Sequence, residues 1–541
     1  MIRIRKAIEE DAGQVCEVFR ASYGDSYTYP HYYDPKFIKK MIFSDDSTVF
    51  VAEDTDTGKI LGTSSVIEEV GAYTDLISEF GRLTVHPDAR GHHIGSQLMR
   101  ARLDHVSGRN QVCLSETRIT HPYSTRIGLK YGFVPLGFEP RKLLMEWRES
   151  AVLMVKHLGN ALQLRRNHPR IIPEVHALAS LCLRNVGLVP DIIVDDEAPA
   201  YPCVGDFDMQ AMDQDGYTQL LRFERGRLKG REIFGPARLH YGFFKLLSRR
   251  STYLVARRNG EIVGAVGFMR DDHEKQIRIF ELIPLDDDVV RCLLSELVKR
   301  GIEEWGTAYF EVDVSAYAPR MQRTLIELGF VPAAYIPALT FHHVERLDIV
   351  KMVRVEGPLD WGPLALVPEV QEVAGQVIES LESRYIVPMV AQTMEHVRLF
   401  DGLTEDQSRR LAARCRLESF EAGDAIFHEG EPSEAMYLVL EGRIELHMGG
   451  APLPQVSVQR GDVLGEVSML GRQPHSATAV ASEPVELAVL PHEELEVLIR
   501  RRPGLGLTLY RNLAAEVAGK LYQSDQALVK RVTKELYLER D

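Results

Sequence analysis

The sequence predicts an α/β (α+β) fold of two similar lobes, followed by a β-barrel or jelly-roll domain with flanking helices. Three observations support this prediction. A strand, a tight turn and a helix follow one another between Glu79 and Arg100. The strand-and-turn pattern of residues 48–62 is repeated at residues 252–264. Short alternating strands with regular glycine turns occupy residues 416–465.

The first lobe is predicted to cover residues 1–150. It begins with an alternating strand at residues 2–7, and apolar residues at helical spacing then predict a helix from Glu9 to Tyr23. The remaining elements follow from alternation, turn residues and helical periodicity. They are strands at Thr48–Glu53, Ile60–Ile67 and Cys113–Arg118, a helix ending near Val106, and a short helix at Ser124–Tyr131.

A glycine-containing loop, Arg90-Gly91-His92-His93-Ile94-Gly95, joins the strand after Glu79 to the next helix. Glycines at such a turn let the backbone approach a ligand closely. The first turn of the helix also offers N–H groups that have no intrahelical partner, which suits an anion such as a pyrophosphate. An ordinary strand–turn–helix with a basic N-terminus is the alternative interpretation.

The order of elements and this loop resemble the GNAT acetyltransferase superfamily, whose acyl-CoA loop reads Arg/Gln-x-x-Gly-x-Gly/Ala. Arg90 takes the first position and Gly95 the last, while His93 replaces the middle glycine. The resemblance implies that acetyl-CoA, or another acyl-CoA, is the cofactor. It assigns the following residues to the cofactor site: Leu83, Val85, Arg90, Gly91, His92, His93, Ile94, Gly95 and His121.

The resemblance also implies the catalytic groups. Histone-type members carry a general base on the strand before the loop, and Glu79 occupies that place; the alternative is a solvated glutamate, because exposure is usual for this residue. The superfamily's general acid is a tyrosine, but Gly128 stands at its position. We expect Tyr123 to replace it, and we expect Tyr131 to pack in the core.

An aromatic loop between the first two helices corresponds to the region that lines the acceptor site in this superfamily. Tyr29, His31, Tyr32 and Asp34 are the residues that we expect to bind or deprotonate an amine. Simple packing of the loop is the alternative. No metal site is expected at the His92-His93 pair, since adjacent side chains diverge and no carboxylate is suitably spaced.

Residues 151–245 are interpreted as a connector with helical pieces at Ser150–Asn160 and Ile172–Asn185. Residues 246–355 are predicted to form a second, GNAT-like lobe. Its counterpart of the phosphate loop contains Asp286-Asp287-Asp288 and lacks glycine. Because these carboxylates would repel a pyrophosphate, this lobe is not expected to bind CoA and is expected to be structural or to wall off the acceptor cleft.

Residues 356–394 are predicted to form a linker with an amphipathic helix, and residues 395–541 resemble a cyclic-nucleotide-binding domain. The segment from Gly465 to Ala479 matches the phosphate-binding cassette of that family. There a glutamate binds the ribose and an arginine binds the phosphate, and this chain has Glu466 and His475 at these positions. The resemblance assigns a nucleotide site to Gly465, Glu466, Val467, Ser468, Arg472, His475 and Ser476.

The composition limits the possible functions. The chain has 541 residues and a formal net charge of −14, which argues against broad nucleic-acid binding. The six cysteines show no CxxC spacing, so neither a disulfide framework nor a zinc site is expected. No apolar run reaches the ~20 residues of a membrane span, and no secretory signal is recognised, so a cytoplasmic location is expected.

Together these features predict an acyl-CoA-dependent N-acetyltransferase that acts on an amine, either a protein lysine or a small molecule. Its C-terminal domain is expected to sense a cyclic nucleotide, cAMP or cGMP, and to alter access to the acyl site. A catalytically silent, ligand-responsive scaffold is the alternative. A transcription factor is disfavoured because no helix-turn-helix is recognised after the barrel.

Overall fold

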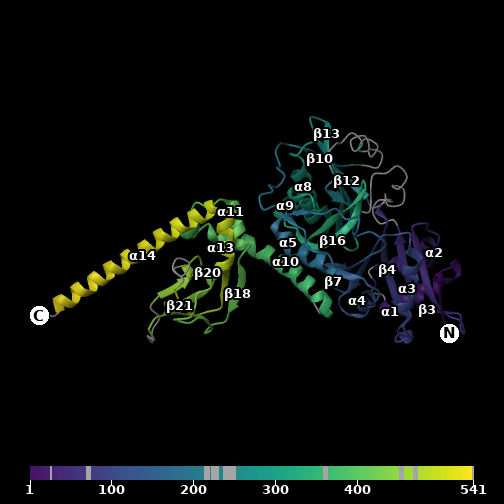
Figure 1. Ribbon diagram of the computed structural model, residues 1–541, viewed down its shortest axis with the longest axis horizontal. Coiled ribbons are helices and arrows are strands. Elements are labelled where there is room, and N and C mark those ends of the chain that lie inside the picture. Colours follow the sequence, from purple (N-terminus) through teal and green to yellow (C-terminus); the bar gives the residue numbers. More distant parts are fainter. Residues whose placement is uncertain are drawn as a thin grey trace. The chain divides into compact units, whose positions relative to one another are not determined.

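The computed structural model describes residues 1–24, 27, 29–68, 75–212, 220, 231–235, 251–357, 364–449, 456–466 and 473–538 (Figure 1). The chain divides into two compact units, Met1–Ser380 and Leu381–Asp541. The helix α10 (Pro368–Met394) contains the boundary between them. None of the helices in the described part of the chain is both long and apolar enough to cross a lipid bilayer.

The first half of the Met1–Ser380 unit, residues 1–157, has the predicted alternation of strands and helices. Each expected strand and helix of residues 1–131 is present, with small shifts at its ends. The elements are β1 (Ile2–Lys6), α1 (Ala12–Tyr23), α2 (Pro35–Ile42), β2 (Ser47–Asp54), β3 (Lys59–Glu68), β4 (Ile77–Val85), α3 (Ile94–Val106), β5 (Val112–Arg118), α4 (Tyr123–Lys130), β6 (Val134–Leu144) and β7 (Arg148–His157).

The second half, residues 208–355, has the same plan. Its elements are β10 (Asp208–Met212), β11 (Ile233–Phe234), β12 (Ser251–Arg258), β13 (Glu261–Asp271), β14 (Gln276–Pro284), α8 (Val290–Glu303), β15 (Tyr309–Ser315), α9 (Pro319–Glu327), β16 (Val331–His342) and β17 (Glu345–Val355). Between the halves lie β8 (Arg170–Ile171), α5 (Pro173–Asn185) and β9 (Ile193–Val194). The helix expected at Ile172–Asn185 is therefore confirmed.

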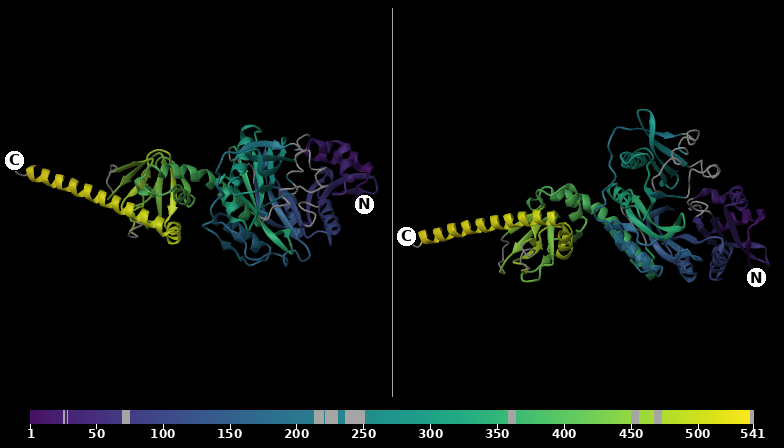
Figure 2. Two further views of the ribbon diagram at one scale, coloured as in Figure 1. Left: turned by 90° about the horizontal axis from the view of Figure 1, so that it is seen from above. Right: turned by 45° about the horizontal axis from the view of Figure 1, so that its top comes forward.

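Both halves contribute to a single sheet of fifteen strands within the described residues (Figures 1 and 2). The order is β1-β2-β3-β4-β5-β7-β6 in the first half and, read inward from its own edge, β10-β12-β13-β14-β15-β17-β16 in the second. Each half has one parallel pair, β4–β5 and β14–β15, and is otherwise antiparallel. The internal sequence repeat thus corresponds to two sub-sheets of the same strand order.

The two halves meet where β6 runs antiparallel to β16. Only one residue pair, Gly137 and Ala334, is in register there. A Cβ atom on Gly137 would lie 2.3 Å from the Ala334 Cβ and 2.9 Å from the Ala333 carbonyl oxygen. Glycine is therefore required for the two strands to approach each other this closely.

A buried network of charges also spans the two halves. Lys142 Nζ on β6 lies 2.7 Å from Glu116, 2.9 Å from Glu139 and 3.1 Å from Glu311, which is on β15. Lys351 on β17 pairs with Glu139 and Glu311 as well. Burial raises the pKa of Glu139 to about 7, whereas Lys142 and Lys351 overcome burial and lower the pKa of Glu311.

Three sequence-based expectations are wrong. Residues 150–157 belong to the strand β7 rather than to a helix, because β7 lies between β5 and β6, is buried on both faces and so lacks the alternation of a half-exposed strand. Residues 151–245 are not only a connector, since β7, β10 and β11 belong to the large sheet. Cys203 and Cys292 form a disulfide, and their separation of 89 residues gave no spacing signal.

The Leu381–Asp541 unit contains two four-stranded antiparallel sheets, ordered β18-β25-β20-β23 and β19-β24-β21-β22, within its described residues. Its strands are β18 (Arg416–Phe420), β19 (Ala425–Phe427), β20 (Ala435–Glu441), β21 (Arg443–His447), β22 (Val456–Gln459), β23 (Val463–Leu464), β24 (Thr478–Ala481) and β25 (Val485–Pro491). Its helices are the end of α10 with α11 (Glu405–Ala412), α13 (His492–Arg501) and α14 (Pro503–Leu538). This is the predicted jelly-roll arrangement with flanking helices.

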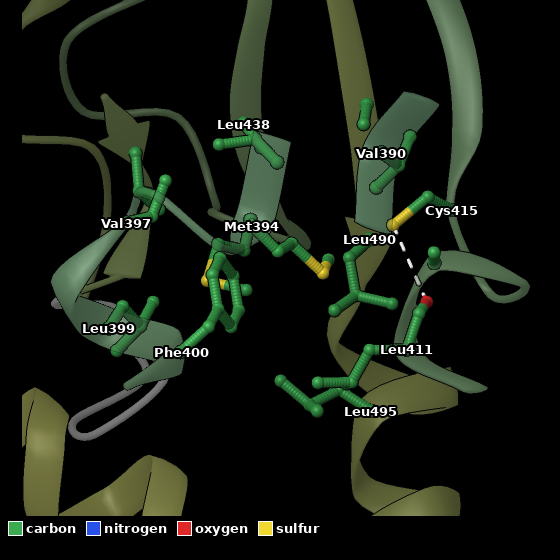
Figure 3. Packing of buried hydrophobic residues seen from close by; sticks show 14 of the residues in the cluster. Val390, Met394, Val397, Leu399, Phe400, Leu411, Cys415, Leu438, Leu490 and Leu495 are labelled. Carbon is green, nitrogen blue, oxygen red and sulfur yellow. Dashed lines mark hydrogen bonds between the residues drawn. The ribbon is translucent and has the colours of Figure 1, made fainter. Parts of the chain in front are cut away.

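A hydrophobic cluster joins the helices of this unit to one of its sheets (Figure 3). Met394 and Phe400 lie at its centre in Figure 3, together with Leu438 of β20 and Leu490 of β25. Cys415 is buried in the same cluster, and its Sγ donates to the Leu411 carbonyl oxygen at 3.5 Å. The helices that precede and follow the sheets are thus part of one core.

Candidate functional site

The parallel pair β4–β5 opens into a gap in the first half. The two strands pair only from Ile77 to Glu79 on β4, opposite Val112 to Leu114 on β5. Farther along, the Ser115 hydroxyl donates to the Phe80 carbonyl oxygen at 3.0 Å, and no strand among the described residues enters the space beyond. Beyond Glu79 and Leu114 the facing edges of the two strands therefore do not pair with each other.

A bulge in β4 lies beside this gap. The register between β3 and β4 shifts between Thr63 and Ser65, and Arg82 has a positive φ of 56°. Such bulges redirect a side chain and leave backbone groups outside the ladder. The cofactor residues that the sequence predicted on this strand, Leu83 and Val85, follow the bulge directly. The Val85 carbonyl oxygen accepts from the Ser22 hydroxyl at 3.2 Å.

The loop after β4 presents free main-chain amides. None of the N–H groups from Gly91 to Ser96 has an acceptor within the described residues, and no side chain caps α3. Arg90, Gly91, His92 and His93 are exposed, whereas Ile94 and Gly95 are buried. Exposed amides at the positive end of a helix are the features that the predicted anion site requires.

His93 occupies a backbone position that favours glycine. It is the N-cap of α3 and lies in the left-handed region, with a φ of 57°. A residue with a Cβ pays roughly 1 kcal/mol for this conformation, which histidine tolerates better than most. The histidine at this position thus strains the backbone of the loop.

Gly95 serves packing rather than ligand approach. A Cβ atom on this residue would lie 2.9 Å from the Ile127 Cδ1 of α4 and 3.9 Å from the Leu83 Cδ2 of β4. The absence of a side chain allows α3 to approach α4 and β4, which positions the free amides at the end of the gap.

Glu79 is tied to the bulge. Its Oε1 accepts from Arg82 Nη1 at 2.8 Å, and Arg82 Nε donates to the Tyr32 hydroxyl at 2.9 Å. The side chain of Glu79 is 39% exposed and that of Arg82 is 22% exposed, so both face an accessible space. The carboxylate predicted as general base is therefore already paired with a guanidinium.

Arg102 of α3 places a buried positive charge beneath β4. It is 1% exposed, its Nη1 donates to the Gly81 carbonyl oxygen at 3.3 Å, and its guanidinium lies 4.9 Å from the centre of the Phe80 ring. No carboxylate in the described part of the chain pairs with it. Burial, and secondly the charge of Arg82, lower its pKa to about 9.

The structure places the other predicted catalytic residues at the start of α4. Tyr123 is 67% exposed, and its ring lies 5.5 Å from that of His121. His121 is half-buried, and burial together with Arg118 lowers its pKa. Gly128 is buried, and a Cβ there would contact Met154 Cε at 3.4 Å. Tyr131, half-buried, begins the turn after α4.

The predicted acceptor residues have different local roles. Asp34 caps α2 by accepting from the Lys36 amide at 2.9 Å. Tyr32 is buried and packs against Phe19 with ring centres 4.9 Å apart. His31 packs edge-on against Phe37 at 4.2 Å. Tyr29 faces Glu274, a residue of the second half. All four thus have local contacts, since the Tyr29 ring also packs against Tyr27, His31 and Tyr32, and Tyr29 in addition faces a residue of the other half.

The equivalent gap in the second half is filled. β14 and β15 pair only from Gln276 to Ile279, and β11 then pairs with β15 and lies against β14. The Ser315 amide donates to the Glu232 carbonyl oxygen at 2.8 Å. Asp286 pairs with Arg258 and Asp287 with Arg320, so side chains of the same half neutralise the acidic loop. A segment of the chain itself occupies this gap.

The structure shows part of the predicted nucleotide site. Gly465 has a φ of 78°, and a Cβ on it would lie 2.5 Å from the Ala435 carbonyl oxygen, so glycine is needed. Glu466 is buried, and Ser476 is exposed. His475 is 7% exposed, stacks on Phe427 at 3.7 Å, and has a pKa lowered by burial. The remaining predicted residues, Val467, Ser468 and Arg472, lie outside the described residues.

Two of these regions, the β4–α3 site and the second unit, lie within matches to known protein families. Residues 45–135 match the family model of the acetyltransferase (GNAT) domain, and residues 417–502 match that of the cyclic nucleotide-binding domain. The chain therefore contains a GNAT acetyltransferase domain, which includes the β4 gap and the Arg90–Gly95 loop, and a cyclic nucleotide-binding domain in its second unit.

Similar individual proteins are matched over short stretches. The chain is 34% identical over 133 residues to the cyclic AMP receptor protein of Thermus thermophilus, which covers 24% of this chain and 60% of that protein. It is 28% identical over 190 residues to the cGMP-dependent protein kinase of Toxoplasma gondii, covering 34% of this chain and 18% of the kinase. The chain thus spans less than two thirds of these relatives.

Solved structures match similarly short stretches. The catabolite activator protein of Thermus thermophilus is 34% identical, with 24% of this chain and 61% of that chain covered and a TM-score of 0.22. A cyclic nucleotide-binding domain from Methylobacillus flagellatus is 24% identical, with 27% and 85% covered and a TM-score of 0.25.

Sequence reasoning missed the residues that the tertiary structure brings to the first-half site. Arg82 holds Glu79, Arg102 lies beneath the bulge, and Glu274 reaches Tyr29 from the second half. No motif signals any of them. The one local hint was the acidic residue Glu274 in the Asp271–Lys275 turn, which resembles an ordinary solvated hairpin turn.

Proposed function

We propose that the chain is an acyl-CoA-dependent N-acetyltransferase that acts on an amine and is regulated by a cyclic nucleotide bound to its C-terminal unit. The row of free amides from Gly91 to Ser96, at the end of an unfilled gap between β4 and β5, is the observation that carries this proposal. Arg90 is exposed beside these amides and adds a charge that suits a pyrophosphate.

The gap explains how the rest of the cofactor would be held. The amide-rich pantetheine arm of an acyl-CoA hydrogen-bonds to main-chain groups that a neighbouring strand would otherwise occupy. The thioester then lies near the β4 bulge, with Glu79, Arg82 and the buried charge of Arg102. Positive charge at this place stabilises the thiolate that leaves in acyl transfer. Tyr123 stays our choice for the group that protonates it.

We propose that the second half is a degenerate GNAT-like lobe, because its described residues show no comparable cofactor site. The strand β11 takes the place of a pantetheine arm, and the loop at Asp286–Asp288 has no glycine and already holds the nearby Arg258 and Arg320 in ion pairs. Its function is then to support the first half and to close the acceptor side of the active site.

A charge placed among the free amides tests the cofactor site. Ser96→Glu is expected to weaken acetyl-CoA binding by about 30- to 100-fold, because a carboxylate a few ångströms from a diphosphate costs roughly 2–3 kcal/mol in a partly exposed site. The same glutamate suits the first turn of a helix, so α3 keeps or gains stability. Isothermal titration with acetyl-CoA measures the affinity, and thermal unfolding checks the fold.

Ser96→Ala is the matched control, with the same position altered and no charge added. It is expected to bind acetyl-CoA within about threefold of the unaltered protein. Absence of acetyl-CoA binding in the unaltered protein would overturn the enzyme proposal. In that event a ligand-responsive scaffold remains, which the buried Gly128 in place of the family's tyrosine would favour.

We propose further that cAMP or cGMP binds the second unit through Gly465, Glu466 and the segment up to Ser476. His475 is neutral at pH 7, because burial lowers its pKa, and it stacks on Phe427. It therefore supplies no charge to a cyclic phosphate. Regulation requires the nucleotide to bind two arrangements of the chain with different affinity.

His475→Arg is expected to tighten cAMP binding by about tenfold or more. Guanidinium is permanently charged, offers a fixed fork of donors, and can still stack on an aromatic ring. Fluorescence titration with a labelled cAMP analogue measures the change. His475→Gln removes the imidazole without adding charge and should not tighten binding. Equal affinity in the arginine variant and the unaltered protein would show that His475 does not face the phosphate.

A further inference from the structure

The turn between β13 and β14 of the second half forms hydrogen bonds with β6 and β7 of the first half. Arg148 of β7 donates through Nη2 to the Glu274 carbonyl oxygen, and Gln276 donates through Nε2 to the Lys142 carbonyl oxygen. Glu274 points inward from this turn and is 4% exposed, although its neighbours Asp272, His273 and Lys275 are exposed. Its carboxyl group faces the hydroxyl of Tyr29 in the predicted acceptor loop.

This carboxyl group differs from its neighbours in having no cation. Glu79 pairs with Arg82 at 2.8 Å and Glu116 pairs with Lys142 at 2.7 Å. No lysine or arginine side chain of the described residues pairs with Glu274, and its Oε1 is buried without a hydrogen-bond partner there. A buried carboxyl oxygen without a hydrogen-bond donor raises the free energy of the folded protein, so this oxygen is suited to accept from a donor on a ligand.

The surrounding charge also favours a cation. The carboxyl groups of Asp271 and Glu116 raise the pKa of Glu274. The charge of Glu274 in turn acts to raise the pKa values of Tyr27, Tyr29 and Arg148. Lys142 and Arg148 are the positive groups in this set, but Glu116, Glu139 and Glu311 surround Lys142, and Arg148 donates to three main-chain carbonyl oxygens. Residues of both halves of the unit thus surround Tyr29 and Glu274, and carboxylates are prominent among them.

We propose that Glu274 of the second half binds the ammonium group of the acceptor beside Tyr29 and takes its proton, so that the acceptor is a cationic primary amine. This inference rests on the proposed acetyltransferase function and assigns to Glu274 the base role that sequence alone gave to Glu79. Glu79 is held by Arg82, and its carboxylate instead orients the guanidinium at the bulge.

The proton balance of the transfer is complete. The ammonium gives one proton to the Glu274 carboxylate, and the nitrogen lone pair forms a bond to the thioester carbonyl carbon. The carbon–sulfur bond then breaks, the Tyr123 hydroxyl gives its proton to the thiolate and regains one from the nitrogen, and the products are an amide and free CoA. Glu274 finally releases its proton to solvent. Burial, reinforced by Asp271 and Glu116, raises the pKa of Glu274 to about 7, which suits a base at neutral pH.

Binding of a simple amine tests the site without requiring the natural acceptor. n-Butylamine is titrated calorimetrically into the full chain, with and without bound CoA, at pH 8. Glu274→Gln is expected to weaken n-butylammonium binding at least tenfold and to leave acetyl-CoA affinity unchanged. Asp272→Asn, an exposed change in the same turn, is the matched control and should bind the amine normally.

Acetylation of poly-L-lysine supplies a second readout. In the unaltered protein kcat/KM should rise with pH through an acidic limb near pH 7, and Glu274→Gln should lose both this limb and at least 100-fold of kcat/KM. Glu274→Asp should keep the limb with reduced rate. Two outcomes would overturn this inference in a protein that binds acetyl-CoA: the Glu274→Gln variant binds n-butylamine as tightly as the unaltered protein, or the unaltered protein does not bind n-butylamine. If the unaltered protein does not bind acetyl-CoA, the proposed function is overturned instead. The n-butylamine titration of the CoA-free chain then still tests whether Glu274 binds an ammonium group.

Discussion

Gly137→Val is expected to destabilise the Met1–Ser380 unit by roughly 3 kcal/mol or more. The new Cβ would lie 2.3 Å from the Ala334 Cβ and 2.9 Å from the Ala333 carbonyl oxygen, and neither contact can be relieved without moving β6 away from β16. Since these strands pair in register at this one position, the junction has no other pair to absorb the shift. Denaturant unfolding, followed by tryptophan fluorescence, measures the loss.

Gly13→Val is the control for this prediction, because it makes the same chemical change at an exposed position of α1 with nothing within 4 Å of the new Cβ. A change within about 0.5 kcal/mol is expected there. Similar losses for the two variants would mean that the close approach of β6 and β16 does not exist.

Lys142→Met is expected to cost about 3–5 kcal/mol, since it leaves the buried Glu139 and Glu311 without the nearer of their two lysine partners. The loss should depend on pH. Burial raises the pKa of Glu139 from 4.5 to about 7 in the folded protein, so this group's contribution to stability is full below about pH 4.5 and is lost as the pH rises to 7. The variant should therefore lose more stability at pH 8 than at pH 5.

A double variant separates charge from packing. Glu139→Gln added to Lys142→Met should restore part of the lost stability, because it removes one of the carboxyl groups that repel one another. Lys59→Met, on an exposed strand end, should change stability by less than about 0.5 kcal/mol. A loss at Lys142 as small as that at Lys59 would contradict the buried network.

Much of the first-half fold was predictable because its strands and helices end at clear turns, such as the Asp56-Thr57-Gly58-Lys59 turn between β2 and β3. Thr48–Glu53 lies within β2, and the helix ending near Val106 is α3. The strand β7 was missed since Ala151 to Val155 are all buried, which removes the alternation that distinguishes a strand from a helix. The Cys203–Cys292 disulfide was missed because partners 89 residues apart leave no local spacing.

The candidate site was predictable where it is local. The loop from Arg90 to Gly95 has its free amides because of its own sequence and the helix that follows. Arg82 could not be foreseen as the partner of Glu79, because its role depends on a bulge that only the β3–β4 register reveals. Glu274 could not be foreseen either, since it reaches Tyr29 only after two sub-sheets have joined at Gly137 and Ala334.

The strand β11 has a consequence for how a repeated architecture divides its tasks. Two grooves of the same topology exist in this unit, and one of them is closed by a short piece of the chain that folds into it. The strand β11 bonds to main-chain groups of β15 that would otherwise need another partner, so the fold of the second half does not depend on a bound molecule for those hydrogen bonds. No such strand lies between β4 and β5 among the described residues.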